Sequence, residues 1–236
     1  MGRLTFDTPR MLGAAFLVVV LTSLFSGLPM GSALGTGSTA DLLRNAANNE
    51  GTVRVAVVIA MLNAAGIVVL ATLLWAVLGR FGRAAAVVGV GLWLGEAFFY
   101  AVGYMGANGL IGLGHDFVAA GSPAGWANLS LGDFLYHGVY KLSGSMLMFF
   151  YCAGGFLFYS LFYVSRVIPR VLAAFGLAMV ALAMVAVVLE LLGYGNLMAL
   201  MAPVGIFELI TGFWLLLGRA NANALASSEG ATGVAS

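Results

Sequence analysis

The 236-residue chain has few charged residues, since Asp, Glu, Lys and Arg together make up 8% of it. Soluble domains carry about 25% charged and about 45–50% apolar residues, whereas this chain is 62% hydrophobic. The composition excludes a water-soluble globular protein and indicates an integral membrane protein, with the lipid bilayer as its main partner. The ten basic residues are scattered singly and the net charge is only +1. The chain therefore lacks the basic patch that nucleic-acid binding requires.

Cysteine and histidine are also scarce. Cys152 is the only cysteine, so the chain cannot form an intramolecular disulfide or a thiolate metal cage. His115 and His137 are the only histidines, and they do not form a His-Glu-x-x-His pattern. A phosphate-binding glycine loop is absent as well. We therefore expect neither a metal site nor a cofactor.

Long apolar runs dominate what remains. Each run is about as long as the ~20 residues that an α-helix needs to cross a bilayer, and turn residues or charges separate them. The pattern predicts an all-α polytopic membrane protein, a bundle of six transmembrane helices that forms a single domain over residues 1–218. The predicted spans are 11–28, 53–79, 84–107, 133–164, 171–192 and 197–218.

Several segments outside these runs also give predictions. Pro29 is expected to end the first span, because proline breaks a helix interior. The segment 39–47 predicts a short surface helix. The glycine-rich stretch 109–132 is expected to be the longest loop. The small and polar residues 219–236 predict a disordered tail.

Basic residues are concentrated on one side of the predicted bundle. Seven arginines lie before the first span or after the second, fourth and sixth spans, whereas only Arg44 and Arg54 lie on the other side. The positive-inside rule then places both termini in the cytoplasm. The seven are Arg3, Arg10, Arg80, Arg83, Arg166, Arg170 and Arg219.

Three polar side chains are expected deep in the bilayer. A rise of 1.5 Å per residue places Glu96 and Glu208 roughly 17 Å into their spans, with Asn63 at a similar level. Tyr100 and Tyr104 follow Glu96 at intervals of four residues, so they share its helix face. A charged side chain at this depth costs a few kcal/mol and normally faces protein or water with a partner.

The only lysine enters the fourth span from the outer side. Asp133, His137 and Lys141 are four residues apart and share one helix face. We expect Lys141 to form a salt bridge with Glu96 or Glu208, with the nearby amide and tyrosine hydroxyls completing the hydrogen bonds. Alternatively, the polar residues only join helices, at about 0.6 kcal/mol each, or the lysine extends to the interface and binds nothing. The predicted ligand- or proton-binding residues are Glu96, Lys141, Glu208, His137, Asn63, Tyr100 and Tyr104.

Short motifs in the first, fourth and sixth helical regions resemble a known family. They are Arg10-x-x-Gly13, Ser165-x-x-x-Pro169-Arg170, Gly205-x-x-Glu208 after Pro203, and Trp214-Leu-Leu. In these motifs the chain is similar to an uncharacterised bacterial membrane family, domain of unknown function 4386. The resemblance implies six helices, a bacterial inner (plasma) membrane location and a special role for Glu208. It implies no activity, and Lys141 is not part of the family pattern.

Three functions are compatible with these residues. The first is small-solute or proton-linked transport or binding, through a polar site in the outer half of the bundle. The second is a non-catalytic membrane partner or assembly factor, in which the polar residues join helices. The third is an intramembrane enzyme acting on a lipid or isoprenoid, with Glu96 as the acid and Tyr100 and Trp93 among its aromatic residues. We rank an enzyme last, and leave the ligand and a homo-oligomer or membrane-protein partner open.

Overall fold

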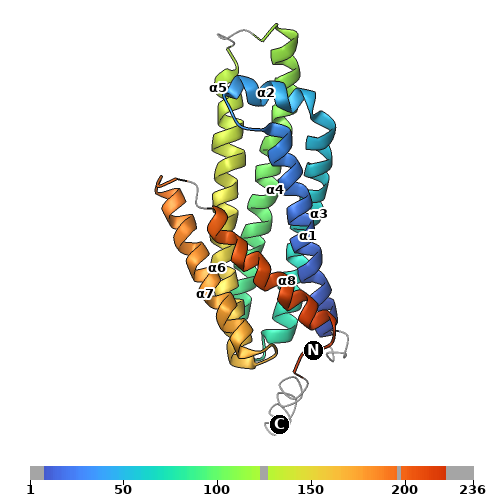
Figure 1. Ribbon diagram of the computed structural model, residues 1–236, viewed down its shortest axis with the longest axis vertical. Helices are drawn as coiled ribbons and strands as arrows, with labels where there is room; N and C mark the ends of the chain where they lie inside the picture. The colour runs from blue at the N-terminus through green and yellow to red at the C-terminus, as the bar shows by residue number, and fades with distance from the viewer. Residues whose placement is uncertain (1–7, 123–126, 196–197, 222–236) are drawn as a thin grey trace. The chain divides into compact units, whose positions relative to one another are not determined.

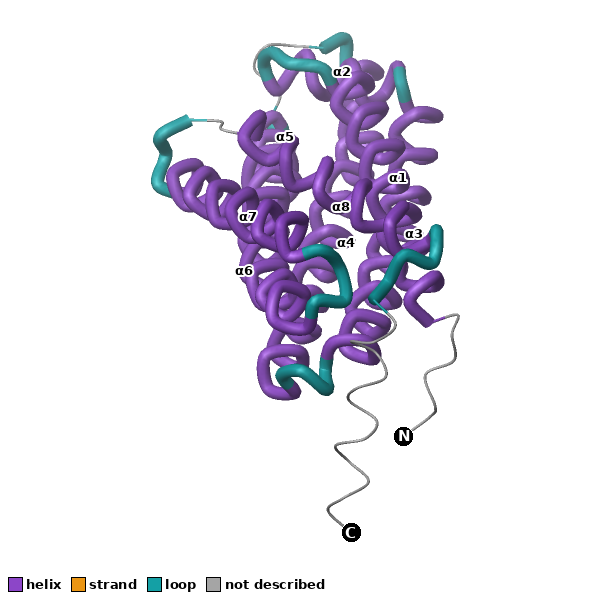
Figure 2. Tube along the Cα trace, turned by 60° about the horizontal axis from the view of Figure 1, so that its bottom comes forward, coloured by secondary structure: helices purple, strands orange, loops and turns teal. Residues whose placement is uncertain are grey.

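The computed structural model describes residues 8–122, 127–195 and 198–221. Every secondary-structure element in these residues is a helix, as Figure 2 shows, which confirms the predicted all-α class. Five helices are long and apolar enough to cross a membrane, and α8 (Ala202–Leu216) is a shorter apolar helix. The five are α1 (Thr8–Leu34), α3 (Glu50–Leu78), α4 (Arg83–Ala119), the continuous segment Leu129–Ser165 and α7 (Arg170–Leu191).

The residues group into two compact units, and each is described by itself. Unit 1 comprises Met1–Val20, Gly66–Gly95 and Met148–Ser236, and unit 2 comprises Leu21–Ala65 and Glu96–Leu147. The helices α1, α3 and α4 and the segment Leu129–Ser165 contribute residues to both units.

Unit 1 contains α7, α8 and the short 3₁₀ helix η2 (Met198–Met201). The helix α7 packs against η2 and α8 (Figure 1). The first turns of α1 approach α8 closely at Gly13. A Cβ atom there would overlap the backbone nitrogen of Leu216 and would lie 2.6 Å from the Gly212 carbonyl oxygen. Only glycine permits this contact between two backbones.

The sixth predicted span, 197–218, is shorter than expected as an α-helix. The helix α8 has 15 residues, and Pro203 lies in its first turn. Proline has no N–H group, and it is tolerated at the start of a helix, where that group has no partner. The α-helix therefore starts beside Pro203, and η2 precedes it.

The predicted disordered tail, 219–236, is described only in its first three residues, because 222–236 lie outside the described ranges. Arg219 to Asn221 belong to the packed structure of unit 1. The backbone N–H of Asn221 donates to the Val167 carbonyl oxygen over 3.1 Å, which ties this segment to the connection between α6 (Leu142–Ser165) and α7.

Unit 2 contains α2 (Thr39–Asn48), which confirms the surface helix predicted in 39–47. The helix α2 packs against α5 (Leu129–Asp133), and the two lie side by side in Figure 1. A Cβ atom at Gly114 of α4 would overlap the Leu43 carbonyl oxygen of α2. The missing side chain of Gly114 thus lets the backbone of α2 approach α4 closely.

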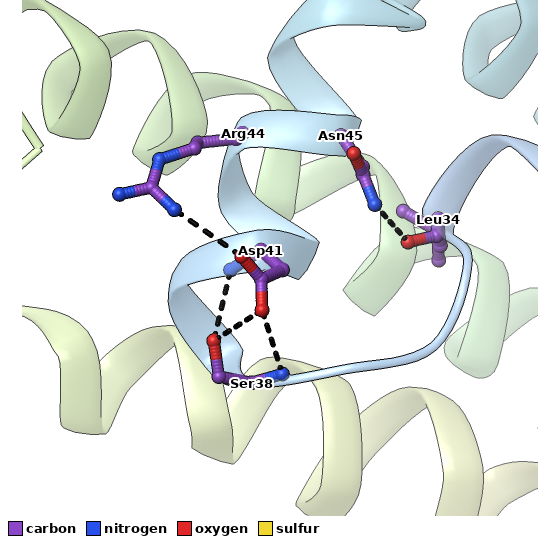
Figure 3. Close-up of polar contacts among 5 residues, drawn as sticks. All are labelled: Leu34, Ser38, Asp41, Arg44 and Asn45. Atoms are coloured by element: carbon purple, nitrogen blue, oxygen red, sulfur yellow. Dashed lines mark hydrogen bonds and ion pairs between the residues drawn. The ribbon is translucent and has the colours of Figure 1, made fainter.

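A capping box holds the start of α2 (Figure 3). The Asp41 N–H donates to Ser38 Oγ over 3.3 Å, and the Ser38 N–H donates to Asp41 Oδ2 over 3.1 Å. Arg44 lies 3.2 Å from the Asp41 carboxylate. The Asn45 amide donates over 2.9 Å to the carbonyl of Leu34, the last residue of α1. Backbone groups left over at two adjoining helix ends therefore find side-chain partners.

Two boundaries predicted for unit 2 are wrong. Pro29 does not end the first helix, since α1 continues to Leu34. Proline inside a helix removes one hydrogen bond, but the remaining backbone groups still need partners in an apolar medium, so the helix is kept. The stretch 109–132 is not one long loop either, because α4 runs on to Ala119 and α5 begins at Leu129. Gly114 and Gly132 lie against Leu43 of α2 and serve helix packing, whereas Gly121, with a φ angle of 80°, lies in the turn after α4.

The segment Leu129–Ser165 is continuous but not uniform. Residues Phe134–Lys141 form a π-helix, η1, between α5 and α6, where the sequence predicted ordinary α-helix. A π-helix of this kind is rare and often occurs at functional sites. It contains His137 and Lys141, two of the predicted site residues.

Candidate functional site

A buried carboxyl group in unit 1 is the clearest polar feature inside the helices. Glu208 of α8 is 8% exposed. The Tyr159 hydroxyl, from α6, donates to Glu208 Oε1 over 2.9 Å. Tyr151, also on α6, has its hydroxyl 3.4 Å from the hydroxyl of Tyr159. Since the single hydroxyl proton of Tyr159 goes to the carboxyl, Tyr151 is the donor in this second contact. We name Glu208, Tyr159 and Tyr151 the carboxyl cluster.

Aromatic neighbours fix the two tyrosines of the carboxyl cluster. The ring of Tyr159 packs on Phe207, with centroids 4.5 Å apart. Trp93 stacks on Tyr151 at 6.1 Å and donates from Nε1 to the Tyr151 carbonyl oxygen over 3.1 Å. A Cβ atom at Gly154 would lie 2.7 Å from Trp93 Nε1, so this glycine makes room for the indole. The hydroxyl groups are therefore held in place by rigid rings.

The carboxyl cluster contains no cation. Among the described residues, no salt bridge includes Glu208. Thr211 lies three residues further along α8, on the same side of the helix. Its Oγ1 is buried and has no hydrogen-bond partner in the described part of the chain. A buried polar atom of this kind is usually satisfied by water, an ion or a ligand.

Unit 2 has a second polar group, built from hydroxyls. Ser26 Oγ of α1 lies 2.9 Å from the Tyr100 hydroxyl of α4. The rings of Tyr100 and Tyr104 stack at 5.2 Å, only 4° from parallel, as residues that share a helix face can do. Tyr140 meets Tyr104 edge-on at 6.0 Å. We name Ser26, Tyr100, Tyr104 and Tyr140 the hydroxyl cluster.

Two further predicted residues of unit 2 are buried. Asn63 is 1% exposed and Glu96 is 7% exposed. The Thr22 hydroxyl donates to Asn63 Oδ1 over 2.7 Å. The amide nitrogen of Asn63 is buried and has no acceptor within the described residues. Both side chains thus lie inside the protein and not against lipid.

The predicted charged face of residues 133, 137 and 141 lies on the surface. His137 Nε2 is 3.7 Å from Asp133 Oδ1, and the two side chains are 59% and 58% exposed. Thr39 of α2 also donates to this aspartate, over 3.1 Å. The spacing by four residues therefore brings neighbours together, but on the exposed side of the helix.

Lys141 is exposed, and its ammonium group lies over two aromatic rings. Its Nζ is 5.4 Å from the ring centre of Tyr136 and 5.9 Å from that of Tyr140. Within the described residues of unit 2 it forms no salt bridge, so the predicted ion pair with Glu96 is wrong. The side chain takes cation–π contacts at the surface instead. The pairing with Glu208 would join the two units and stays a prediction.

Sequence reasoning missed the partners of the buried polar groups. Tyr159 and Tyr151 belong to a run of aromatic residues, and Ser26 and Thr22 look like ordinary small residues of the first span. One signal was present, because a buried tyrosine hydroxyl usually needs a hydrogen-bond partner. The sequence does not say which tyrosine lies inside and which lies against lipid.

A family model described as "Domain of unknown function (DUF4386)" matches residues 11–218. The match runs from α1 to the end of α8 and includes every residue of the carboxyl and hydroxyl clusters. Comparisons with the curated proteins and with the solved structures gave no match.

Proposed function

The chain belongs to the DUF4386 family of domains of unknown function, and we propose that it binds or transports a small solute together with a proton or a small cation. The carboxyl cluster carries this proposal. Glu208 is buried in an apolar helix, and a tyrosine hydroxyl orients its carboxyl group.

The argument rests on the cost of an unpaired charge. A buried ion is stable only when it is paired, and no described cation of unit 1 pairs with Glu208. We propose that the positive charge comes from outside the protein, as a proton or as a bound cation, and the predicted pairing with Lys141 of unit 2 is the alternative. Ionisable residues within membrane helices commonly mark such proton relays and ion pathways. The buried and unsatisfied Thr211 hydroxyl, one turn away, supplies a further ligand atom.

We also propose that η2 and α8 together make a sixth crossing. Four residues at about 2.0 Å and 15 residues at 1.5 Å extend over roughly 30 Å, the thickness of the hydrocarbon core. Six crossings put both ends of the chain on one side, and the excess of arginine favours the cytoplasm of a bacterial cell, with the protein in the inner membrane. A reporter fused after Asn221 and active only in the cytoplasm tests this, and activity of an exported reporter there would contradict it.

Infrared difference spectroscopy tests whether Glu208 takes up a proton. The purified full-length protein in lipid vesicles is titrated with acid, and the carbonyl stretching band of a protonated carboxyl group is followed. We expect one such band to be absent in Glu208→Gln and present in Asp116→Asn, which removes an exposed acid. If Glu208→Gln and the wild type give the same bands, Glu208 is not the proton-binding group.

A flux measurement tests transport itself. Vesicles that contain a pH-sensitive dye report proton entry under imposed proton, Na⁺ and K⁺ gradients. We expect the wild type and Asp116→Asn to exceed protein-free vesicles under at least one gradient, and Glu208→Gln to lose most of this flux. Equal background flux for all samples would contradict ion or proton transport, and would favour the role of a membrane partner.

A further inference from the structure

Unit 1 contains a cavity of about 390 Å³ where the connection between α6 and α7 meets the end of α8. Three arginines line it: Arg166 from the connection, Arg170 from the first turn of α7, and Arg219 from the segment after α8. Val167, Ile168 and Trp214 also line the cavity, and Val167 and Ile168 are buried. The cavity therefore combines an apolar floor with a basic rim.

The charge around this cavity has one sign. None of the described residues that line it is acidic. A fourth arginine lies close by, since a Cβ atom at Gly218 would be 3.1 Å from the Arg10 guanidinium group. Arg170 lies over the ring of Tyr163 at 5.3 Å and Arg219 over Trp214 at 5.5 Å. Such stacking orders a guanidinium group while its N–H donors remain available to a ligand.

Hydrogen bonds hold the walls of the cavity together before any ligand binds. The Asn221 N–H donates to the Val167 carbonyl oxygen over 3.1 Å, and Trp214 Nε1 donates to the Arg219 carbonyl oxygen over 2.9 Å. Arg166 has a φ angle of 57°, in the left-handed region that favours glycine. Its N–H donates to the Phe162 carbonyl oxygen over 3.1 Å, so this residue closes the end of α6 and turns the chain into the connection.

The start of α7 adds to the positive potential. The helix has 22 residues and begins at Arg170, and Pro169 at its N-cap provides no side-chain hydrogen bond to the first turn. Free N–H groups and the helix dipole favour an anion at such an end. The negative potential at the C-terminal end of α8 is weaker, because the N–H groups of Leu217, Gly218 and Arg219 donate to its last carbonyl oxygens.

We propose that this cavity binds a phosphate group, carried by the headgroup of an anionic membrane lipid or present as a free phosphate anion. Arginine donates in a planar fork that fits phosphate oxygens. The apolar floor suits the glycerol part of a lipid, and tryptophan is common at the level of lipid headgroups. The cavity lies at helix ends, in two of the connections that carry the excess of arginine. Anionic lipids attract basic residues at such positions. This proposal is independent of the carboxyl cluster.

Native mass spectrometry of the full-length protein in detergent tests the lipid source. The protein is titrated with phosphatidylglycerol and, separately, with zwitterionic phosphatidylcholine. We expect preferential binding of phosphatidylglycerol, which weakens as salt is raised. The double variant Arg170→Gln/Arg219→Gln should bind it on the order of 30-fold more weakly, at about fivefold for each arginine. The control Arg83→Gln removes one exposed arginine of unit 1 outside the cavity and should bind as the wild type does.

Calorimetry with inorganic phosphate tests the soluble source. Phosphate binding that the double variant loses and Arg83→Gln keeps would support the site, with a free anion as its ligand. Two results would overturn the proposal. One is that neither phosphatidylglycerol nor phosphate binds with any dependence on Arg170 and Arg219. The other is that Arg83→Gln loses as much affinity as the double variant. If the double variant does not fold, the single change Arg170→Gln, at an exposed position, is used with the same criteria.

Discussion

The carboxyl cluster of unit 1 and the hydroxyl cluster of unit 2 differ in what their tyrosines do. In unit 1, Tyr159 donates to a buried carboxyl group, and Phe207 and Trp93 fix the tyrosines. In unit 2, Tyr100 bonds to another neutral hydroxyl, and the rings stack on one another. The first arrangement orients a group that can carry charge, whereas the second joins helices. The comparison teaches that a buried tyrosine marks a functional site only through its partner.

The largest expected effect is a loss of stability from a glycine substitution, which should be large in unit 1 and small in unit 2. Gly13→Val places a side chain against the backbone of α8 in unit 1, where nothing can move aside easily. Overpacking costs about 1–3 kcal/mol and more when backbone is involved, so we expect a loss of about 3 kcal/mol in the free energy of unfolding. The matched change Gly31→Val, on the same helix in unit 2, meets no atom within 4 Å and should cost under about 1 kcal/mol. Thermal unfolding in detergent compares them, and equal losses would contradict the close approach of α1 and α8.

Removing one hydroxyl from each cluster tests the difference in partners directly. Tyr159→Phe deletes the donor to a buried carboxyl group, and hydrogen bonds to charged groups are worth about 1.5–3 kcal/mol. Tyr100→Phe deletes a neutral contact worth about 1 kcal/mol, and Ser26 keeps its bond to the Ser23 carbonyl oxygen. We expect the unfolding free energy to fall by about twice as much for the first variant. A larger loss for Tyr100→Phe would reverse the comparison.

Lys141→Gln tests whether this lysine of unit 2 makes surface cation–π contacts or a buried ion pair. The change removes two cation–π contacts of an exposed ammonium group, each worth about 0.5–1 kcal/mol. We expect a fall of about 1 kcal/mol in the unfolding free energy and no change in the infrared bands assigned to carboxyl groups. A loss of about 3–5 kcal/mol is typical of a broken buried ion pair, and it would restore the predicted pairing of this lysine with a carboxylate.

The smallest expected effect is a pH dependence at the start of α2. The side-chain and backbone hydrogen bonds from Ser38 hold the pKa of Asp41 below its ordinary value of 3.8. A lowered pKa stabilises the folded cap above pH 3.8, and this contribution is lost as the pH falls through the pKa of the folded state. Hydrogen exchange of α2 peptides, referenced to α3 peptides at the same pH, should show loss of protection on acidification. Asp41→Asn should remove this dependence, and if the variant keeps it, another group is responsible.

Much of the fold was predictable because it depends on hydropathy and length. The five long helices fall on the first five predicted spans. The errors came from proline and glycine residues, which occur both at helix ends and inside packed helices. Pro29 and the glycines of 109–132 predicted breaks, but a helix in an apolar medium keeps its hydrogen bonds, and Gly114 serves close packing with α2.

The candidate site was predictable in part. Burial of Glu208, Glu96, Asn63, Tyr100 and Tyr104 agrees with their positions inside apolar runs. The exposure of His137 and Lys141 does not follow from spacing, because a regular interval places residues on one face but does not say what that face meets. Their position in a π-helix could not be predicted either, since its pattern of hydrogen bonds leaves no mark in the composition.

By itself, the sequence determined the all-helical class and the approximate positions of the five long apolar helices. The length and order of the apolar runs suffice for this, because apolar segments of that length cannot leave backbone groups unpaired in lipid. Only the tertiary structure decided which partner each polar group meets. Tyr159 reaches Glu208 from a position 49 residues away, and three arginines from two segments surround one cavity. Such contacts depend on how helices pack, which is set by the shapes of many side chains at once.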